Sequence, residues 1–298
     1  MRDFFTLKSS DEIMHNMYVK VYPNGRVEAL VCDKRLFREA GWELASDKRK
    51  AWERLTWWDY LTDEARAEFE YAELERSAKR FDDSNARARR RARSAVRDIA
   101  YANDDMDMFV TFTLDAAKID RYDVGEITKK LNIWLDNRVR RNGLKYVLVP
   151  ELHKDGAVHF HGLVNAAALS PVDSGTLTKG GARPRKPRGA AARNALLADG
   201  WQVVYNLPEW TYGFSTGIYL YGERGAAVNY TTKYIEKTTE KVGGRWYYSG
   251  GALERPAVYF EDCDSAAFFT EHADGMFETD HGWRFCAATI EEGFSCRD

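Results

Sequence analysis

The chain has 298 residues, of which 44% are hydrophobic and 30% are charged, and its formal net charge is -2. This size and composition predict one or two soluble globular domains with a core large enough to fold unaided. The absence of a long apolar run and of a signal-like opening argues against a membrane or secreted protein, so we expect a cytoplasmic protein with no membrane partner. A zinc ribbon or disulfide scaffold is disfavoured by four widely spaced cysteines, Cys32, Cys263, Cys286 and Cys296.

In chain order, the first predicted element is a β-hairpin over residues 17–32, where two apolar runs flank an Asn-Gly turn at residues 24–25. Residues 46–100 are rich in Ala, Glu, Leu and Arg, and they predict a mainly helical region. Within it, residues 87–97 hold six arginines and no acid. This cluster is either a solvated helix face or a contact with phosphates, for which Arg90 and Arg91 are the candidates.

The middle of the chain predicts strands on both sides of a helix. Residues 108–115, MFVTFTLD, are β-branched and aromatic, which is typical of a strand. Residues 121–143 carry apolar side chains at steps of three and four and end at a glycine, as an α-helix does. The runs LKYVLVPELH and AVHFHGLVN flank the turn residues KDG and predict a second hairpin over residues 144–165.

A basic loop, expected over residues 166–200, follows this hairpin as an insertion. Residues 179–193, KGGARPRKPRGAAAR, hold six basic residues and no acid, and their Gly and Pro content predicts mobility. A loop of this charge can wrap a polyanion without specifying its sequence. The candidate DNA-binding residues in it are Arg183, Arg185, Lys186 and Arg188.

After the insertion we expect two short strands within residues 200–223, a helix over 225–239 and an extended edge at 244–253. Residues 261–298 carry ten acidic side chains against two arginines, so the near-neutral total hides basic segments and an acidic end. The whole pattern predicts an α+β fold with a mainly antiparallel sheet. We expect three parts: a helical N-terminal region over 1–100, a central domain over 101–250 and an acidic tail over 251–298.

Two histidines stand two residues apart in the run AVHFHGLVN. Side chains at i and i+2 lie on the same face of a strand, so His159 and His161 project together. Pairing around the turn brings Glu151 near them, and two imidazoles with one carboxylate leave coordination positions open on a divalent cation. His153 lies on the same strand face as Glu151 and is the alternative third ligand. The plainer alternative is a pair of histidines on a solvated sheet face.

Two tyrosines and two lysines recur at helical spacing in NYTTKYIEK, residues 229–237. Positions i and i+4 share a helix face, so Tyr230 and Tyr234 point the same way, with Lys233 and Lys237 on an adjacent face. A tyrosine hydroxyl has an ordinary pKa near 10 and needs a cation or ammonium nearby to attack phosphorus at neutral pH. The plainer alternative is an apolar core stripe with lysines reaching solvent.

Together these segments resemble the HUH endonucleases, and in particular the replication initiators of rolling-circle phages and plasmids. FVTFTLD looks like the first strand motif of that family, HFHGL matches its His-hydrophobe-His metal motif, and YTTKYIEK looks like its nucleophile motif in the two-tyrosine form. The three follow the family order over roughly residues 105–250. Two departures are the TFTLD in the first motif, in place of a Leu-Thr-Leu-Thr run, and the basic insertion.

The resemblance implies an RRM-like or ferredoxin-like sheet of about five strands with flanking helices. It implies that the protein starts rolling-circle replication by nicking and rejoining single-stranded origin DNA through a 5′-phosphotyrosine. The expected setting is a bacterial host cell, whose DNA polymerase and helicase would be partners. The implied residues are Glu151, His159 and His161 for Mg²⁺ or Mn²⁺, and Tyr230, Tyr234, Lys233 and Lys237 for catalysis.

Three other functions fit parts of this pattern. A non-catalytic RRM-like module would use the histidines and tyrosines to stack on single-stranded nucleic acid. Another HUH enzyme, a mobilisation relaxase or a transposase, would share the metal motif, although relaxases usually carry the tyrosine ahead of the histidines. A metal-dependent hydrolase without a covalent step would keep its activity when both tyrosines become phenylalanine.

Overall fold

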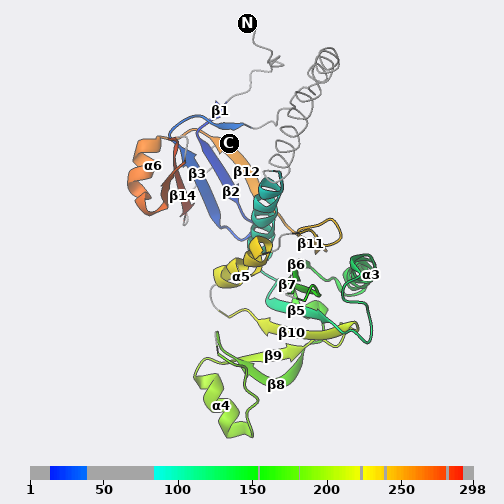
Figure 1. The fold of residues 1–298 in the computed structure, drawn as a ribbon. Helices are drawn as coiled ribbons and strands as arrows, with labels where there is room; N and C mark the ends of the chain where they lie inside the picture. The colour runs from blue at the N-terminus through cyan, green and yellow to red at the C-terminus, as the bar shows by residue number, and fades with distance from the viewer. Residues whose placement is uncertain are drawn as a thin grey trace, which may run out of the picture. The chain divides into compact units, whose positions relative to one another are not determined.

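The structure, a computed structural model, describes residues 14–38 and 84–290, apart from 154, 181, 222–223, 238–239 and 280–281. The chain divides into two compact units, which Figure 1 shows as ribbons: unit 1 combines Met1–Ala86 with Pro256–Asp298, and unit 2 is Arg87–Arg255. Each unit contains helix and antiparallel sheet, so the predicted α+β class is confirmed. In the part of the chain that the structure describes, no helix is long and apolar enough to cross a membrane.

Unit 1 is built on an antiparallel sheet in the order β12-β2-β3-β14-β13, beside a small sheet of β1 and β4. The hairpin predicted over residues 17–32 is confirmed: β2 and β3 are joined at Gly25, whose φ of 84° suits a tight turn. The elements are β1 (Met14–His15), β2 (Met17–Val21), β3 (Val27–Cys32), β4 (Phe37–Arg38), β12 (Ala257–Glu261), α6 (Ser265–Glu271), η3 (Ala273–Gly275), β13 (Met276–Glu278) and β14 (Arg284–Ile290).

The C-terminal segment is a structural part of unit 1, where the sequence favours a separate acidic tail over residues 251–298. β14 pairs with β3 from Phe285↔Cys32 to Ile290↔Val27, and β12 pairs with β2. The tail prediction weighs the acidic side chains, but the apolar ones between them, such as Phe269 and Cys286, are buried in the unit 1 core. Residues 84–102 form a helix, and the rest of the predicted helical region, 46–83, lies outside the described residues.

Unit 2 has one antiparallel sheet of seven strands, in the order β11-β6-β7-β5-β10-β9-β8, which can be followed in Figure 1. Helix 84–102 precedes the sheet in sequence. The other elements are β5 (Met108–Leu114), α3 (Val124–Asn142), β6 (Tyr146–Leu152), β7 (Val158–Val164), η2 (Ala166–Ala168), β8 (Val172–Thr178), α4 (Ala190–Ala198), β9 (Gln202–Asn206), β10 (Gly213–Tyr219), α5 (Arg224–Lys237) and β11 (Tyr248–Gly250).

The sheet has more strands than the five or so expected, because the basic insertion is not a loop throughout. Its residues 172–178 form β8, which pairs with β9, and residues 190–198 form α4. The run AAARNALLA is rich in good helix formers, a feature that the loop prediction underweights beside the Gly and Pro residues. The four candidate DNA-binding residues of this segment lie between β8 and α4 and are exposed.

The two faces of the sheet carry different helices and different cores. On one face α3 packs through Ile127, Leu131, Trp134 and Leu135, and it ends at Gly143 with a φ of 69°, as its sequence predicts. On the other face, α5 and helix 84–102 enclose a second core, whose buried members include Val96, Ile99, Val147, Val149, Leu163, Val228 and Ile235. This second face positions the residues of the candidate site.

Gly162, which follows the histidines in HFHGL, has no room for a side chain. A Cβ there would lie 1.9 Å from the carbonyl oxygen of Val147 and 2.8 Å from the Cα of Leu148 on β6. Gly162→Ala is therefore expected to push β6 from β7 and to lower the free energy of unfolding by at least about 1–3 kcal/mol. Thermal unfolding checks this, with Gly180→Ala, where the new Cβ would meet no atom within 4 Å, as the matched control. Equal melting temperatures for the two variants would contradict it.

Candidate active site

Three strands place the predicted metal ligands in register on one face of the sheet. On the β6–β7 pair, Glu151 stands directly opposite His159, and on the β5–β7 pair Thr113 stands opposite His159 and Thr111 opposite His161. Directly paired residues share a face, so these side chains form a small polar patch between two apolar layers. The hairpin geometry inferred from the sequence, with Glu151 beside both histidines, is what the structure contains.

Hydrogen bonds hold the two imidazoles from both sides. His161 Nε2 lies 2.9 Å from Glu151 Oε2, and its Nδ1 lies 3.1 Å from Thr111 Oγ1. His159 Nδ1 lies 3.5 Å from Thr113 Oγ1. The sequence analysis does not single out the two threonines, although the alternation in FVTFTLD contains the necessary signal. Residues 109, 111 and 113 share a face, opposite the buried side chains of Met108, Val110, Phe112 and Leu114.

Burial sets the charge state of both histidines. Desolvation lowers the pKa of His161 although Glu151 pulls it upward, and desolvation followed by the nearby His153 lowers the pKa of His159. With pKa values below the ordinary 6.5, both imidazoles are neutral at pH 7. A neutral imidazole has a free lone pair, which is the form that binds a metal ion.

Helix α5 brings the paired tyrosines against this patch. Val228 and Ile235 anchor the helix in the core, while the Tyr234 ring stacks on His161 with 4.0 Å between centroids and 4° between planes. The Tyr230 ring meets Tyr234 edge-on at 5.1 Å. The prediction that the two phenols point the same way is confirmed, since both rings lie beside the imidazole of His161.

The two tyrosines differ sharply in their access to solvent. Tyr230 is 50% exposed, whereas Tyr234 is 5% exposed. Burial, together with a hydrogen bond to Tyr230, raises the pKa of the Tyr234 hydroxyl far above its ordinary range. At neutral pH the Tyr234 hydroxyl is therefore protonated and closed to solvent in this arrangement, while the Tyr230 side chain is open.

Of the two lysines, Lys237 is the one that the structure brings to the site. Its Nζ lies 3.8 Å from Glu151 Oε1 and 5.2 Å from the centroid of the Tyr234 ring. Lys233 is exposed on the same helix. His153, the alternative third ligand, stacks on His159 at 5.0 Å between centroids and is more than half exposed, with Nδ1 3.7 Å from Asp155.

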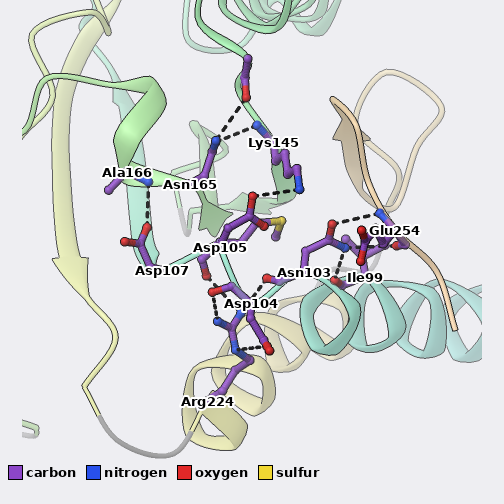
Figure 2. A network of polar contacts seen from close by, with 12 residues as sticks. Ile99, Asn103, Asp104, Asp105, Asp107, Lys145, Asn165, Ala166, Arg224 and Glu254 are labelled. Atoms are coloured by element: carbon purple, nitrogen blue, oxygen red, sulfur yellow. Dashed lines mark hydrogen bonds and ion pairs between the residues drawn. The ribbon is translucent and has the colours of Figure 1, made fainter. Parts of the chain in front are cut away.

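Arg224, the first residue of α5, fixes where the tyrosine helix begins. As Figure 2 shows, its guanidinium reaches toward the end of helix 84–102 and the segment that leads into β5. Nη1 donates to the carbonyls of Ala100, Asn103 and Met106 at 3.0–3.1 Å, and Nη2 donates to the carbonyl of Asp104. These carbonyls come at or just after a helix C-terminus, where a cation is favourable.

Arg224→Ala is expected to loosen α5 from this anchor. Hydrogen bonds to a charged donor contribute about 1.5–3 kcal/mol each, so we expect the free energy of unfolding to fall by at least about 2–3 kcal/mol. Amide hydrogen exchange along α5 should rise at the same time. Arg224→Lys is the matched control and should restore only part of the stability, because an ammonium cannot match the planar fork. Unchanged exchange in α5 would contradict the anchoring role.

The predicted basic residues lie away from the histidines and tyrosines. Arg90 and Arg91 are exposed on helix 84–102. Arg185 forms an isolated bridge with Leu177 of β8, the edge strand at the opposite end of the sheet from β6, and its guanidinium lies 4.9 Å from the Trp201 ring. These residues therefore form two separate exposed basic surfaces rather than part of the candidate active site.

In the described part of the chain, no group of three or more His, Cys, Asp or Glu side chains is drawn together tightly enough to hold a metal ion as it stands. The reason lies in the local bonding, because Glu151 and His161 face each other at 2.9 Å and His159 lies beside them, with 6.4 Å between the two imidazole centroids. The donor types and their shared face are in place.

Comparison with known families identifies what this arrangement resembles. Residues 107–239 match the family model for a replication-associated protein of the ORF2 type. The matched segment runs from the start of β5 through α5, so it includes the histidines, Glu151 and both tyrosines. The replication-associated match supports a replication initiator. Searches of curated proteins and of solved structures returned no match.

Proposed function

We propose that unit 2 is the nicking domain of a rolling-circle replication initiator, a HUH endonuclease of the two-tyrosine form that acts on single-stranded origin DNA. One observation carries the proposal. Within the matched residues, Tyr234 stacks on His161 at 4.0 Å and Tyr230 stands 5.1 Å from Tyr234, so two phenols adjoin a paired imidazole and carboxylate. Neither a core stripe nor a solvated sheet face explains why these groups converge.

The residues fit Mg²⁺ or Mn²⁺ in their chemistry. Glu151, His159 and His161 would hold the ion, since both imidazoles are neutral and the two threonine hydroxyls engage their Nδ1 atoms. Such partners of the other ring nitrogen orient a histidine so that Nε2 is presented to a metal. When bound, the ion would polarise the scissile phosphate as a Lewis acid.

Tyr230 is the first nucleophile in this proposal, because its side chain is half exposed and a DNA strand can reach it. Its hydroxyl oxygen bonds to phosphorus and the P–O3′ bond breaks. The phenol loses its proton to solvent and the departing O3′ takes one up, which leaves a 5′-phosphotyrosine and a free 3′-OH. The enzyme–DNA bond retains the energy of the phosphodiester, so rejoining needs no ATP.

Tyr234 is the second nucleophile, held in reserve under the first. It would attack only after its ring leaves the face of His161 and meets solvent, because burial keeps its hydroxyl protonated. After one round of synthesis it would cleave the regenerated origin, and the 3′-OH so released would attack the Tyr230 linkage. Two nucleophiles one helical turn apart suit this alternation.

Lys237 is the residue best placed to stabilise charge on the phosphate. Its ammonium lies beside both Glu151 and the Tyr234 ring, whereas Lys233 is exposed on the helix. A fixed positive charge near the developing negative charge lowers the barrier to attack. The partners that follow from this chemistry are single-stranded origin DNA, a host DNA polymerase that extends the 3′-OH, and a host helicase.

The test is a covalent-adduct assay with the full-length chain. The protein is incubated with single-stranded oligonucleotides from its own replicon and Mn²⁺, and denaturing gels are searched for a DNA-linked band. The band should disappear with EDTA and in the Tyr230→Phe/Tyr234→Phe double variant, and survive in Tyr221→Phe, an exposed tyrosine outside α5. Binding without an adduct would favour the non-catalytic module, and cleavage by the double variant would favour a hydrolase without a covalent step.

A further inference from the structure

A single row of side chains crosses the sheet from the candidate active site to an exposed phenylalanine. The strand registers pair Glu151 of β6 with His159 of β7, His159 with Thr113 of β5, and Thr113 with Phe214 of β10. Residues paired in this way share a face, so Phe214 stands on the same surface as the histidines. Adjacent strands lie about 4.7–4.9 Å apart, which puts the backbone of Phe214 about 10 Å from that of His159.

Phe214 is exposed in a way that the core does not explain. Its side chain is 71% exposed, and among the described residues it has no aromatic ring partner. Phe112, on the neighbouring strand, is fully buried and stacks on Trp210 at 4.6 Å. The strand is held firmly beneath it, because Ser215 Oγ bonds both the amide and the carbonyl of Leu207.

The surroundings of Phe214 point to a polyanion with unpaired bases. Along its face stand the hydroxyl-bearing side chains of Thr113 and Thr216, and beyond β10 the sheet continues through β9 and β8 to the exposed basic segment of residues 183–188. A strand leaving the histidines across β5 and β10 thus runs toward positive charge. Phosphates would be drawn to that edge, and a flat apolar ring would be offered to a base.

We propose that Phe214 is a stacking platform for an unpaired base of the DNA strand, next to the phosphate bound at the histidines. The proposal builds on the proposed function, since it assigns the path of the same substrate. A phenylalanine ring offers no hydrogen bonds, so the platform accepts every base and confers single-strand preference rather than sequence specificity. An exposed ring on a rigid strand needs no rearrangement to receive a base.

The test measures binding and needs no cleavage. The full-length protein is titrated with a fluorescein-labelled oligothymidylate of about 16 nucleotides and with an abasic deoxyribose-phosphate chain of the same length, without added metal. Stacking contributes about 1–3 kcal/mol per base, so Phe214→Ala should weaken oligothymidylate binding on the order of 10-fold and leave binding of the abasic chain unchanged. The salt dependence should also stay the same, because no charge is removed.

Three further variants separate stacking from other effects. Phe214→Trp should retain the affinity, Phe214→Leu should lose it although the position stays apolar, and Ile133→Ala, which removes a half-exposed apolar side chain from α3, should bind normally. Equal weakening of both probes, or wild-type binding by Phe214→Ala, would overturn the platform. Loss of base preference in Phe214→Ala without any adduct from the wild type would overturn the nicking proposal and leave the platform standing.

Discussion

Tyr230→Phe is expected to abolish the first cleavage, lowering the rate of adduct formation with an intact origin strand by at least about 10³-fold, as removal of a covalent nucleophile does in other enzymes. Tyr234→Phe is expected to retain most of that rate. The asymmetry follows from burial, because Tyr230 is half exposed while Tyr234 is 5% exposed and stacked on His161. The phenylalanine ring keeps the stacking in both variants, so the loss of the hydroxyl is the main change.

Single-turnover assays on denaturing gels measure this first step, and a second substrate tests the other tyrosine. When the adduct formed on one oligonucleotide is offered a second origin strand, Tyr234→Phe should fail to transfer, although it forms the first adduct normally. Tyr221→Phe, which changes an exposed tyrosine of the same sheet domain, is the matched control. A faster first cleavage by Tyr230→Phe than by Tyr234→Phe would show that the buried tyrosine acts first and that α5 rearranges before cleavage.

Glu151→Gln is expected to cost at least about 10- to 100-fold in the rate of adduct formation at limiting Mn²⁺, and more Mn²⁺ should recover part of it. Even partners that only orient a metal ligand cost this much when removed. Glutamine keeps the shape and a carbonyl oxygen but removes the negative charge, and with it the ion pair to Lys237 at 3.8 Å. Chelation by EDTA should abolish adduct formation by the wild type.

His153→Ala is the matched control, because it tests the alternative ligand that the sequence leaves open. His153 is mostly exposed and lies close to Asp155, whereas Glu151 is bonded to His161 at 2.9 Å. We therefore expect His153→Ala to change the Mn²⁺ dependence little. Binding of Mn²⁺, followed by electron paramagnetic resonance in the absence of DNA, should weaken in Glu151→Gln only. The reverse ranking of the two variants would assign the third ligand to His153.

Much of the active-site patch is predictable from local patterns. The alternation in FVTFTLD and AVHFHGLVN fixes which side chains share a strand face, and the turn at residues 154–156 fixes the register that sets Glu151 opposite His159. The spacing of Tyr230 and Tyr234 places them on one helix face whatever surrounds the helix. These inferences hold because they depend only on the repeat of the backbone, which neighbouring elements do not alter.

The errors come from segments where composition outweighs pattern. The acidic residues of the C-terminal segment suggest a tail, yet Cys286 and Phe269 are buried beneath strands that pair with β2 and β3. The glycines and prolines of the insertion suggest a loop, yet β8 and α4 form around them. In both cases a few apolar side chains with strand or helix spacing decide the structure, because burial of those groups outweighs the charge around them.

The sequence by itself determined the order of the elements, the His159–Glu151 face and the paired tyrosines, since these rest on short-range geometry. Only the tertiary structure decided that Tyr234 is buried while Tyr230 is open, that Lys237 rather than Lys233 reaches Glu151, and that Phe214 continues the row of His159 across the sheet. Exposure and charge pairing depend on which elements pack together, and such contacts join residues far apart in the chain that no local repeat connects.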